Sequence, residues 1–265
     1  MGRCSFRPWI LVISLLYPAN SFADVSFDPT PGVVAEQPVE KHEDWIRQSD
    51  MNLTRRASGL NQWEGDATAS LGSGAPGGFS ATPGVTGRLG LGYGLTAELS
   101  AFGSAIRPDS YRPGVGLKWQ FLGDAKSKFS GAIMGLYRPE GFNTSEGEVE
   151  VHLLGAFRRG RSELLLNLTA GGDADGREQD VEAHLGGGYH ISNDFIIGGE
   201  YQSRASLGSR IEKTGVQEHI VGPSVQYRLG KFLLSGLAGA GAIQLQHGSA
   251  LEVGGYGMAR LGYHF

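Results

Sequence analysis

From about residue 64 to the C-terminus, apolar or small residues alternate with polar residues in one long segment after another. In the segment 179–191, Val181, Leu185 and Tyr189 belong to the apolar set, and the positions between them carry all of the charge. A period of two is typical of a β-strand with two different faces. The segments 112–122 and 147–158 repeat it. These segments are longer than the roughly 5–6 residues of a common strand and match the ~9–11 residues needed to cross a bilayer at a tilt.

Twelve such segments predict an all-β fold, a single antiparallel transmembrane β-barrel of twelve strands over 64–265. Tight connections such as 93–94 and 230–231 alternate with longer ones rich in Gly, Pro, Asp and Ser, as periplasmic turns and extracellular loops do. An even number of strands leaves both chain ends in the periplasm. The faces of 232–244 cannot be assigned, because this segment is apolar on both sides. The expected strands are 64–72, 83–93, 95–104, 112–122, 127–138, 147–158, 162–171, 179–191, 195–204, 216–229, 232–244 and 253–265.

Aromatic residues gather at the strand ends beside the tight turns. Such a girdle is expected where a barrel crosses the membrane interface. A soluble β-sandwich with ordinary core aromatics is the alternative, but it does not explain the clustering at one end. The residues concerned are Tyr93, Phe121, Phe129, Phe157, Tyr189, Phe195, Tyr227, Phe232 and Tyr263.

Residues 1–23 have the layout of a secretory signal peptide. Arg3 and Arg7 form a positive region, an apolar stretch runs to Tyr17, and Ser21-Phe22-Ala23 offers small residues where a signal peptidase reads them. The apolar stretch is too short to span a membrane, which argues against an uncleaved anchor. We expect cleavage after Ala23 and localisation in the outer membrane.

Residues 24–63 lack the alternation of the strand segments. The stretch 28–32 is turn-rich, and 36–56 is dense in charge. We expect a flexible, polar periplasmic extension with one short helix near 40–56. The alternative is that this helix sits inside the barrel as a plug.

Composition excludes several classes of protein. After the presequence no apolar run reaches the ~18 residues of a membrane helix. The net charge of −4 gives no basic footprint, so we expect no nucleic-acid partner. The sole cysteine, Cys4, lies in the signal peptide, so a disulfide framework and thiolate metal sites are excluded from the mature chain.

Charged residues of the alternating segments are assigned to the lumen, because an Arg or Lys facing lipid at the midplane would cost about 2–4 kcal/mol. They could be structural ion pairs that fill a narrow barrel or a selective binding track. Glycines on the same face, among them Gly90, Gly114 and Gly186, would leave room for solutes or mark sites of strand bending. The expected lumen-lining residues are Arg88, Glu98, Lys118, Glu150, His152, Asp180, Glu182, His184, Glu200 and Arg260.

The C-terminus carries a family resemblance. Gly257, Ala259, Leu261, Tyr263 and Phe265 alternate and stop at a terminal Phe. This resembles the signature that bacterial outer-membrane proteins present to the barrel-assembly machinery. The resemblance implies that Tyr263 and Phe265 form the assembly signal and that the partners are this machinery and the outer-membrane lipid bilayer.

The hairpin Gly92-Tyr93-Gly94-Leu95-Thr96-Ala97-Glu98-Leu99 is similar to the early hairpin of outer-membrane transporter barrels linked to aromatic-compound degradation. In those barrels the position after Thr is usually acidic, and here it is Ala97.

His190-Ile191-Ser192-Asn193 resembles the His-x-Ser-Asn motif of outer-membrane acyl hydrolases, which implies His190 as general base and Ser192 as nucleophile. The chain departs from that pattern at Asp194 and Arg204, where a small residue and an orienting Asn or acid are expected.

The stretch 172–176 contains a fragment of a calcium-loop pattern without its bidentate Glu. The histidines do not fall at metal-ligand spacing, so we expect no metal site.

We therefore expect a passive outer-membrane channel or transporter-like barrel for small solutes, without a cofactor or covalent chemistry. Two alternatives stay open: an acyl hydrolase that uses His190 and Ser192, and a non-conducting structural or surface barrel. An open lumen would favour transport, and a lumen blocked by paired Glu and Arg would favour the structural role.

Overall fold

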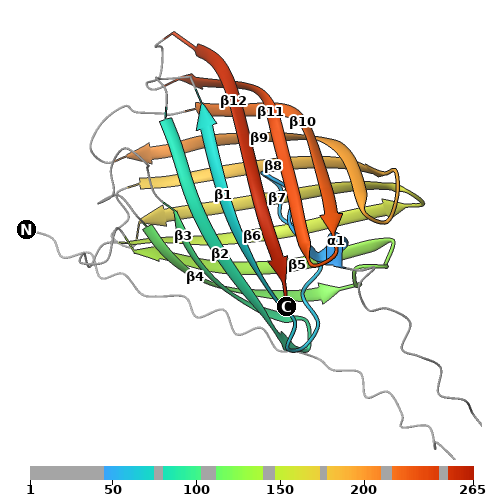
Figure 1. The fold of residues 1–265 in the computed structure, drawn as a ribbon. Coiled ribbons are helices and arrows are strands. Elements are labelled where there is room, and N and C mark those ends of the chain that lie inside the picture. The colour runs from blue at the N-terminus through green and yellow to red at the C-terminus, as the bar shows by residue number, and fades with distance from the viewer. Residues whose placement is uncertain are drawn as a thin grey trace, which may run out of the picture. The chain divides into compact units, whose positions relative to one another are not determined.

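Twelve β-strands close into one antiparallel barrel in which each strand pairs with the next and β1 closes on β12 (Figure 1). The computed structural model describes residues 45–74, 80–102, 112–139, 147–173, 178–209, 217–244 and 250–265. The chain divides into two units, Met1–Val39 and Glu40–Phe265, and all described residues belong to the second. The predicted signal peptide therefore lies outside the described residues.

The strand number and the order along the chain are as predicted, and most boundaries agree within a few residues. β9 is longer than expected, because it continues past residue 204. The strands are β1 (Gly65–Gly74), β2 (Ser80–Gly92), β3 (Leu95–Phe102), β4 (Arg112–Leu122), β5 (Phe129–Pro139), β6 (Gly147–Arg159), β7 (Ser162–Asp173), β8 (Glu178–His190), β9 (Phe195–Ser209), β10 (Gln217–Leu229), β11 (Phe232–Gln244) and β12 (Glu252–His264).

The strand faces follow the predicted alternation. On β6, Val149, Val151 and Leu153 are exposed on the outside, whereas Glu150 and His152 are buried inside. β11, whose faces the pattern left open, points Leu233 and Leu237 inward and exposes Leu234. A closed sheet satisfies the backbone hydrogen bonds of every strand, so an apolar outer surface can face hydrocarbon without a free sheet edge.

Aromatic side chains form an outward-facing belt at the end of the barrel that carries the tight turns. Phe129 pairs across strands with Phe157 at a ring-centroid distance of 5.0 Å, and Phe232 pairs with Tyr263 at 5.2 Å. In one of the two-residue turns, between β2 and β3, Tyr93 and Gly94 adopt positive φ angles of 54° and 75°. The predicted clustering at strand ends is confirmed, and it lies where the interfacial aromatics of a membrane barrel are found.

One short helix, α1 (Trp45–Gln48), precedes the barrel in the described part of the chain. Among the described residues, no helix is long and apolar enough to cross a membrane.

Candidate functional site: the plugged lumen

Residues 48–60, here called the plug, run inside the barrel as an irregular hairpin. Gln48 and Leu60 lie at the short-turn end, where they line one hollow together with Tyr93 and Asp124. Most of the plug is buried, and Thr54 and Arg56 have no exposed surface. The expectation of an extension that stays outside the barrel is therefore wrong for this part of 24–63. The plug alternative is the one observed, although the helix covers only the four residues Trp45–Gln48 and the plug beyond Gln48 is not helical.

Glu200 on β9 holds the tip of the plug. Its carboxylate oxygens accept hydrogen bonds from the backbone N–H groups of Asn52, Leu53 and Thr54 at 3.1, 2.6 and 2.9 Å. The Asn52 side chain also donates to Glu200 and to the carbonyl oxygen of Gly236. A buried carboxylate is stable only if donors replace its water, and here the plug backbone supplies them.

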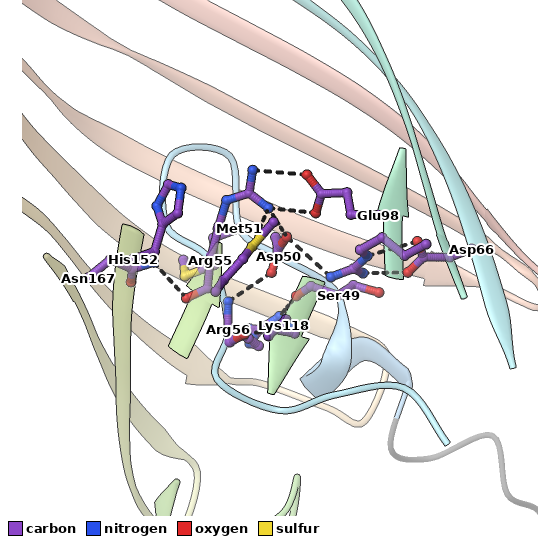
Figure 2. Close-up of polar contacts among 12 residues, drawn as sticks. Ser49, Asp50, Met51, Arg55, Arg56, Asp66, Glu98, Lys118, His152 and Asn167 are labelled. Carbon is purple, nitrogen blue, oxygen red and sulfur yellow. Dashed lines mark hydrogen bonds and ion pairs between the residues drawn. The ribbon is translucent and has the colours of Figure 1, made fainter. Parts of the chain in front are cut away.

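The two plug arginines pair with acids on the barrel wall. Arg55 binds Glu98 through both terminal nitrogens, at 2.7 and 3.1 Å (Figure 2). Arg56 pairs with Glu163, an ion pair without exposed side-chain surface. Lys118 donates to the carbonyl oxygens of Arg56 and Ser58 at 3.1 and 2.9 Å. Charged side chains of the barrel wall thus bind the plug as well as one another.

Two inward glycines make room for the plug. A Cβ atom on Gly90 would lie 2.9 Å from the carbonyl oxygen of Leu60, and one on Gly186 would lie 2.9 Å from Thr54 Oγ1. Gly222 instead allows a close approach of two strands, since a Cβ there would lie 2.5 Å from the carbonyl oxygen of Ala238 on β11. The expectation that these positions leave room for solutes is wrong at Gly90 and Gly186, because the plug occupies that room.

A cavity of ≈190 Å³ lies over the plug tip, on the side of the longer connections. We call it the vestibule. Its wall carries two His–Glu pairs, each formed by residues two positions apart on one strand. His152 Nε2 lies 2.9 Å from Glu150 Oε2, and His184 Nε2 lies 3.0 Å from Glu182 Oε2. Its lining includes Asp50, Asn52, Thr54, Arg55, Arg88, Arg138, Glu150, His152, Asn167, Glu182, His184 and Arg260.

The structure places the predicted lumen residues in two groups. Glu98, Lys118 and Glu200 lie at the level of the plug and bind it directly. Arg88, Glu150, His152, Glu182, His184 and Arg260 line the vestibule, and Arg88 and Arg260 also contact Asp50 of the plug. Asp180 pairs with Arg204 Nε at 2.7 Å.

Asp50 on the plug lies among four cations. Burial alone would raise the pKa of its carboxyl group, but Arg88, Lys118, Arg55 and Arg260 outweigh burial and hold this pKa well below its usual range. Asp50 was absent from the predicted site. The only sequence signal for it was the charge density of 36–56.

The proposed catalytic pair does not act as a dyad in this geometry. His190 is buried and points to Glu163, with Nε2 at 3.7 Å from Oε2. Ser192 lies in the exposed turn after β8, where its Oγ accepts the N–H of Asp194 at 3.2 Å. This is ordinary turn chemistry.

Among the described residues no group of three or more His, Cys, Asp or Glu could hold a metal ion, and most of the calcium-like stretch 172–176 lies outside them.

No family model matches the chain, and no curated protein matches it. Several solved structures are similar to it in fold. An outer-membrane channel from Pseudomonas putida F1 superposes with a TM-score of 0.56 at 11% identity, covering 79% of this chain and 98% of that one. The KdgM porin in complex with disordered oligogalacturonate gives 0.53 at 10% identity, covering 76% and 99%. The NanC porin gives 0.52 at 12% identity, covering 75% and 98%. The likeness is one of fold: this chain is a porin-like twelve-stranded barrel.

Proposed function

We propose that this protein is a passive outer-membrane channel for small polar solutes and that the plug closes it in the state seen here. The observation that carries the proposal is the vestibule, a polar cavity inside a closed barrel whose outer surface is apolar. A solute that enters it meets charged and hydrogen-bonding side chains down to the plug tip. Conduction then requires the plug to move.

The membrane setting rests on the same features. The apolar exterior and the aromatic belt suit a lipid bilayer, and residues 1–23 suit export. The similar structures include an outer-membrane channel and a porin in complex with oligogalacturonate. The proposal extends to assembly by the barrel-assembly machinery and includes no enzymatic step, because Ser192 is engaged in its turn.

A non-conducting structural barrel is the second candidate. The plug favours it, because Glu98, Glu163 and Glu200 bind this segment from three different strands. Under this candidate the plug stays in place permanently and the barrel only presents its connections.

Single-channel recording in planar bilayers separates the two. We expect the purified protein to open rarely and a variant that lacks residues 45–60 to open stably. A variant that lacks residues 28–40 is the matched control, because it shortens the same extension and keeps the plug. Heat-modifiable migration in gels checks that each variant is folded. A folded barrel without the plug that does not conduct would establish the structural role instead.

A further inference from the structure

Asp50 is the one acidic residue of the plug. Its Oδ2 lies 3.2 Å from Arg88 Nη1 and 4.0 Å from Arg55 Nη1, and its Oδ1 accepts the N–H of Arg56 at 2.8 Å. Arg260 Nη1 donates to the Asp50 carbonyl oxygen at 3.4 Å. One carboxylate therefore lies where guanidinium groups from β2, β12 and the plug itself converge.

Arg88 and Arg260 belong to the barrel and stay in place if the plug moves. Arg88 is buried. Its Nε and Nη2 donate to the two carboxylate oxygens of Asp66 on β1, and its Nη1 has no hydrogen-bond acceptor in good geometry, although Asp50 lies within ion-pair distance. Arginine binds carboxylate and phosphate oxygens in two-pronged hydrogen bonds. Asp66 takes up that mode on Arg88, which leaves Nη1 for one oxygen of a second anion. Nη1 of Arg88 and Nη1 of Arg260 thus form a preformed anion site on the barrel, which the Asp50 carboxylate and the carbonyl oxygens of Asp50 and Met51 occupy at present.

A solute can reach this site from the vestibule. Asp50, Arg55, Arg88 and Arg260 all line the cavity, whose ≈190 Å³ suits a small molecule, since a water molecule takes up about 30 Å³ in the liquid.

We propose that a small carboxylate or phosphate solute binds at Arg88 and Arg260, replaces Asp50 there and so releases the plug. The proposal rests on the proposed function in taking the plug as the gate. The anion is then both the ligand of the site and the signal that opens the lumen.

The test measures plug release directly. Ala57 is fully buried and packs near Ala132 and Leu154. An Ala57→Cys variant would carry the only cysteine of the mature chain, because Cys4 lies in the predicted signal peptide. The rate at which a water-soluble thiol reagent modifies this cysteine in the purified, folded protein reports how often the plug leaves. It is compared in sodium chloride, sodium acetate and sodium phosphate at equal ionic strength.

We expect acetate, phosphate or both to raise the rate about tenfold over chloride, roughly the factor that one hydrogen bond to a charged group contributes to an equilibrium. A response to acetate alone identifies a carboxylate ligand, and a response to phosphate alone identifies a phosphate. Asp50→Asn should label fast in all three salts, because the charge that competes with the anion is gone. Asn52→Ala is the matched control: it loosens the plug at Glu200 and should keep the response to the anion.

Equal rates in the three salts, or an anion response that survives Asp50→Asn, would overturn the inference. The labelling does not depend on conduction. A protein that shows the anion response but never conducts keeps this site and loses the channel function. One that conducts without an anion response keeps the function and loses the site.

Discussion

Glu200 holds the tip of the plug through backbone groups, and not through a partner of opposite charge. Three consecutive N–H groups, those of residues 52–54, point at its carboxylate. Backbone donors are present whatever side chains the plug carries, so the contact depends on the plug's conformation. The arginine pairs add to it but depend on single plug side chains, Arg55 with Glu98 and Arg56 with Glu163.

Replacing Glu200 with Ala should weaken docking of the plug by about 2 kcal/mol, roughly 30-fold, because buried donors lose their acceptor. Trypsin can check this, since it would cut the folded protein after Arg55 or Arg56 only when the plug leaves the lumen. Glu182→Ala is the control: Glu182 is a lumen glutamate paired with His184 and Arg204. If trypsin cut both variants equally fast at these sites, Glu200 would have no special part in holding the plug.

At the scale of the strand, neighbouring positions meet opposite surroundings. Leu185 lies near the middle of β8, is 44% exposed on the outside and pairs with Leu166 on β7. His184, one residue earlier, lines the vestibule. The same substitution at these two positions therefore tests the two faces separately.

Leu185→Arg should lower the free energy of unfolding by about 2–4 kcal/mol, the cost of an Arg at the bilayer midplane. His184→Arg should cost much less, because the lumen is polar. Urea unfolding of the barrel in lipid vesicles measures both. Similar losses for the two variants would contradict the assignment of Leu185 to lipid.

At the scale of the whole molecule, the barrel is completed by contact between its two ends. Gly65 and Phe265 exchange backbone hydrogen bonds at 3.0 and 2.9 Å, and the Phe265 ring covers Gly65 so closely that a Cβ there would overlap it. Phe265 thus has a place in the seam between β1 and β12, in addition to its proposed part in assembly.

Deleting Phe265 distinguishes its contact in the β1–β12 seam from its proposed role as an assembly signal. If it is an assembly signal, the amount of folded barrel in the outer membrane should fall several-fold, while the yield of refolding into detergent without any machinery stays nearly unchanged. Phe265→Tyr keeps a terminal aromatic ring and should behave as the unmodified protein in both assays. An equal loss in cells and in detergent would assign Phe265 to the seam alone, and no loss in cells would remove the proposed signal.

The alternation of residues alone determined the strand number, nearly all strand boundaries and the two faces of every strand except β11. This works because each strand of a membrane barrel meets lipid on one side and a polar lumen on the other, so the constraint acts on every strand separately and appears locally in the sequence. Val151 and Leu185 face outward, and Glu150 and His184 face inward, as that argument requires.

Only the tertiary structure decided what fills the lumen. The plug has no periodic pattern, and its partners Glu98, Glu163 and Glu200 come from strands far apart in the chain. The alternation shows that a charged residue points inward, but it carries no information about which group meets it there. The same limit explains Gly90, whose missing side chain leaves room for Leu60 at the end of the plug and for Asn61, the next residue. Contacts between an irregular segment and many strands arise only when the barrel closes around it.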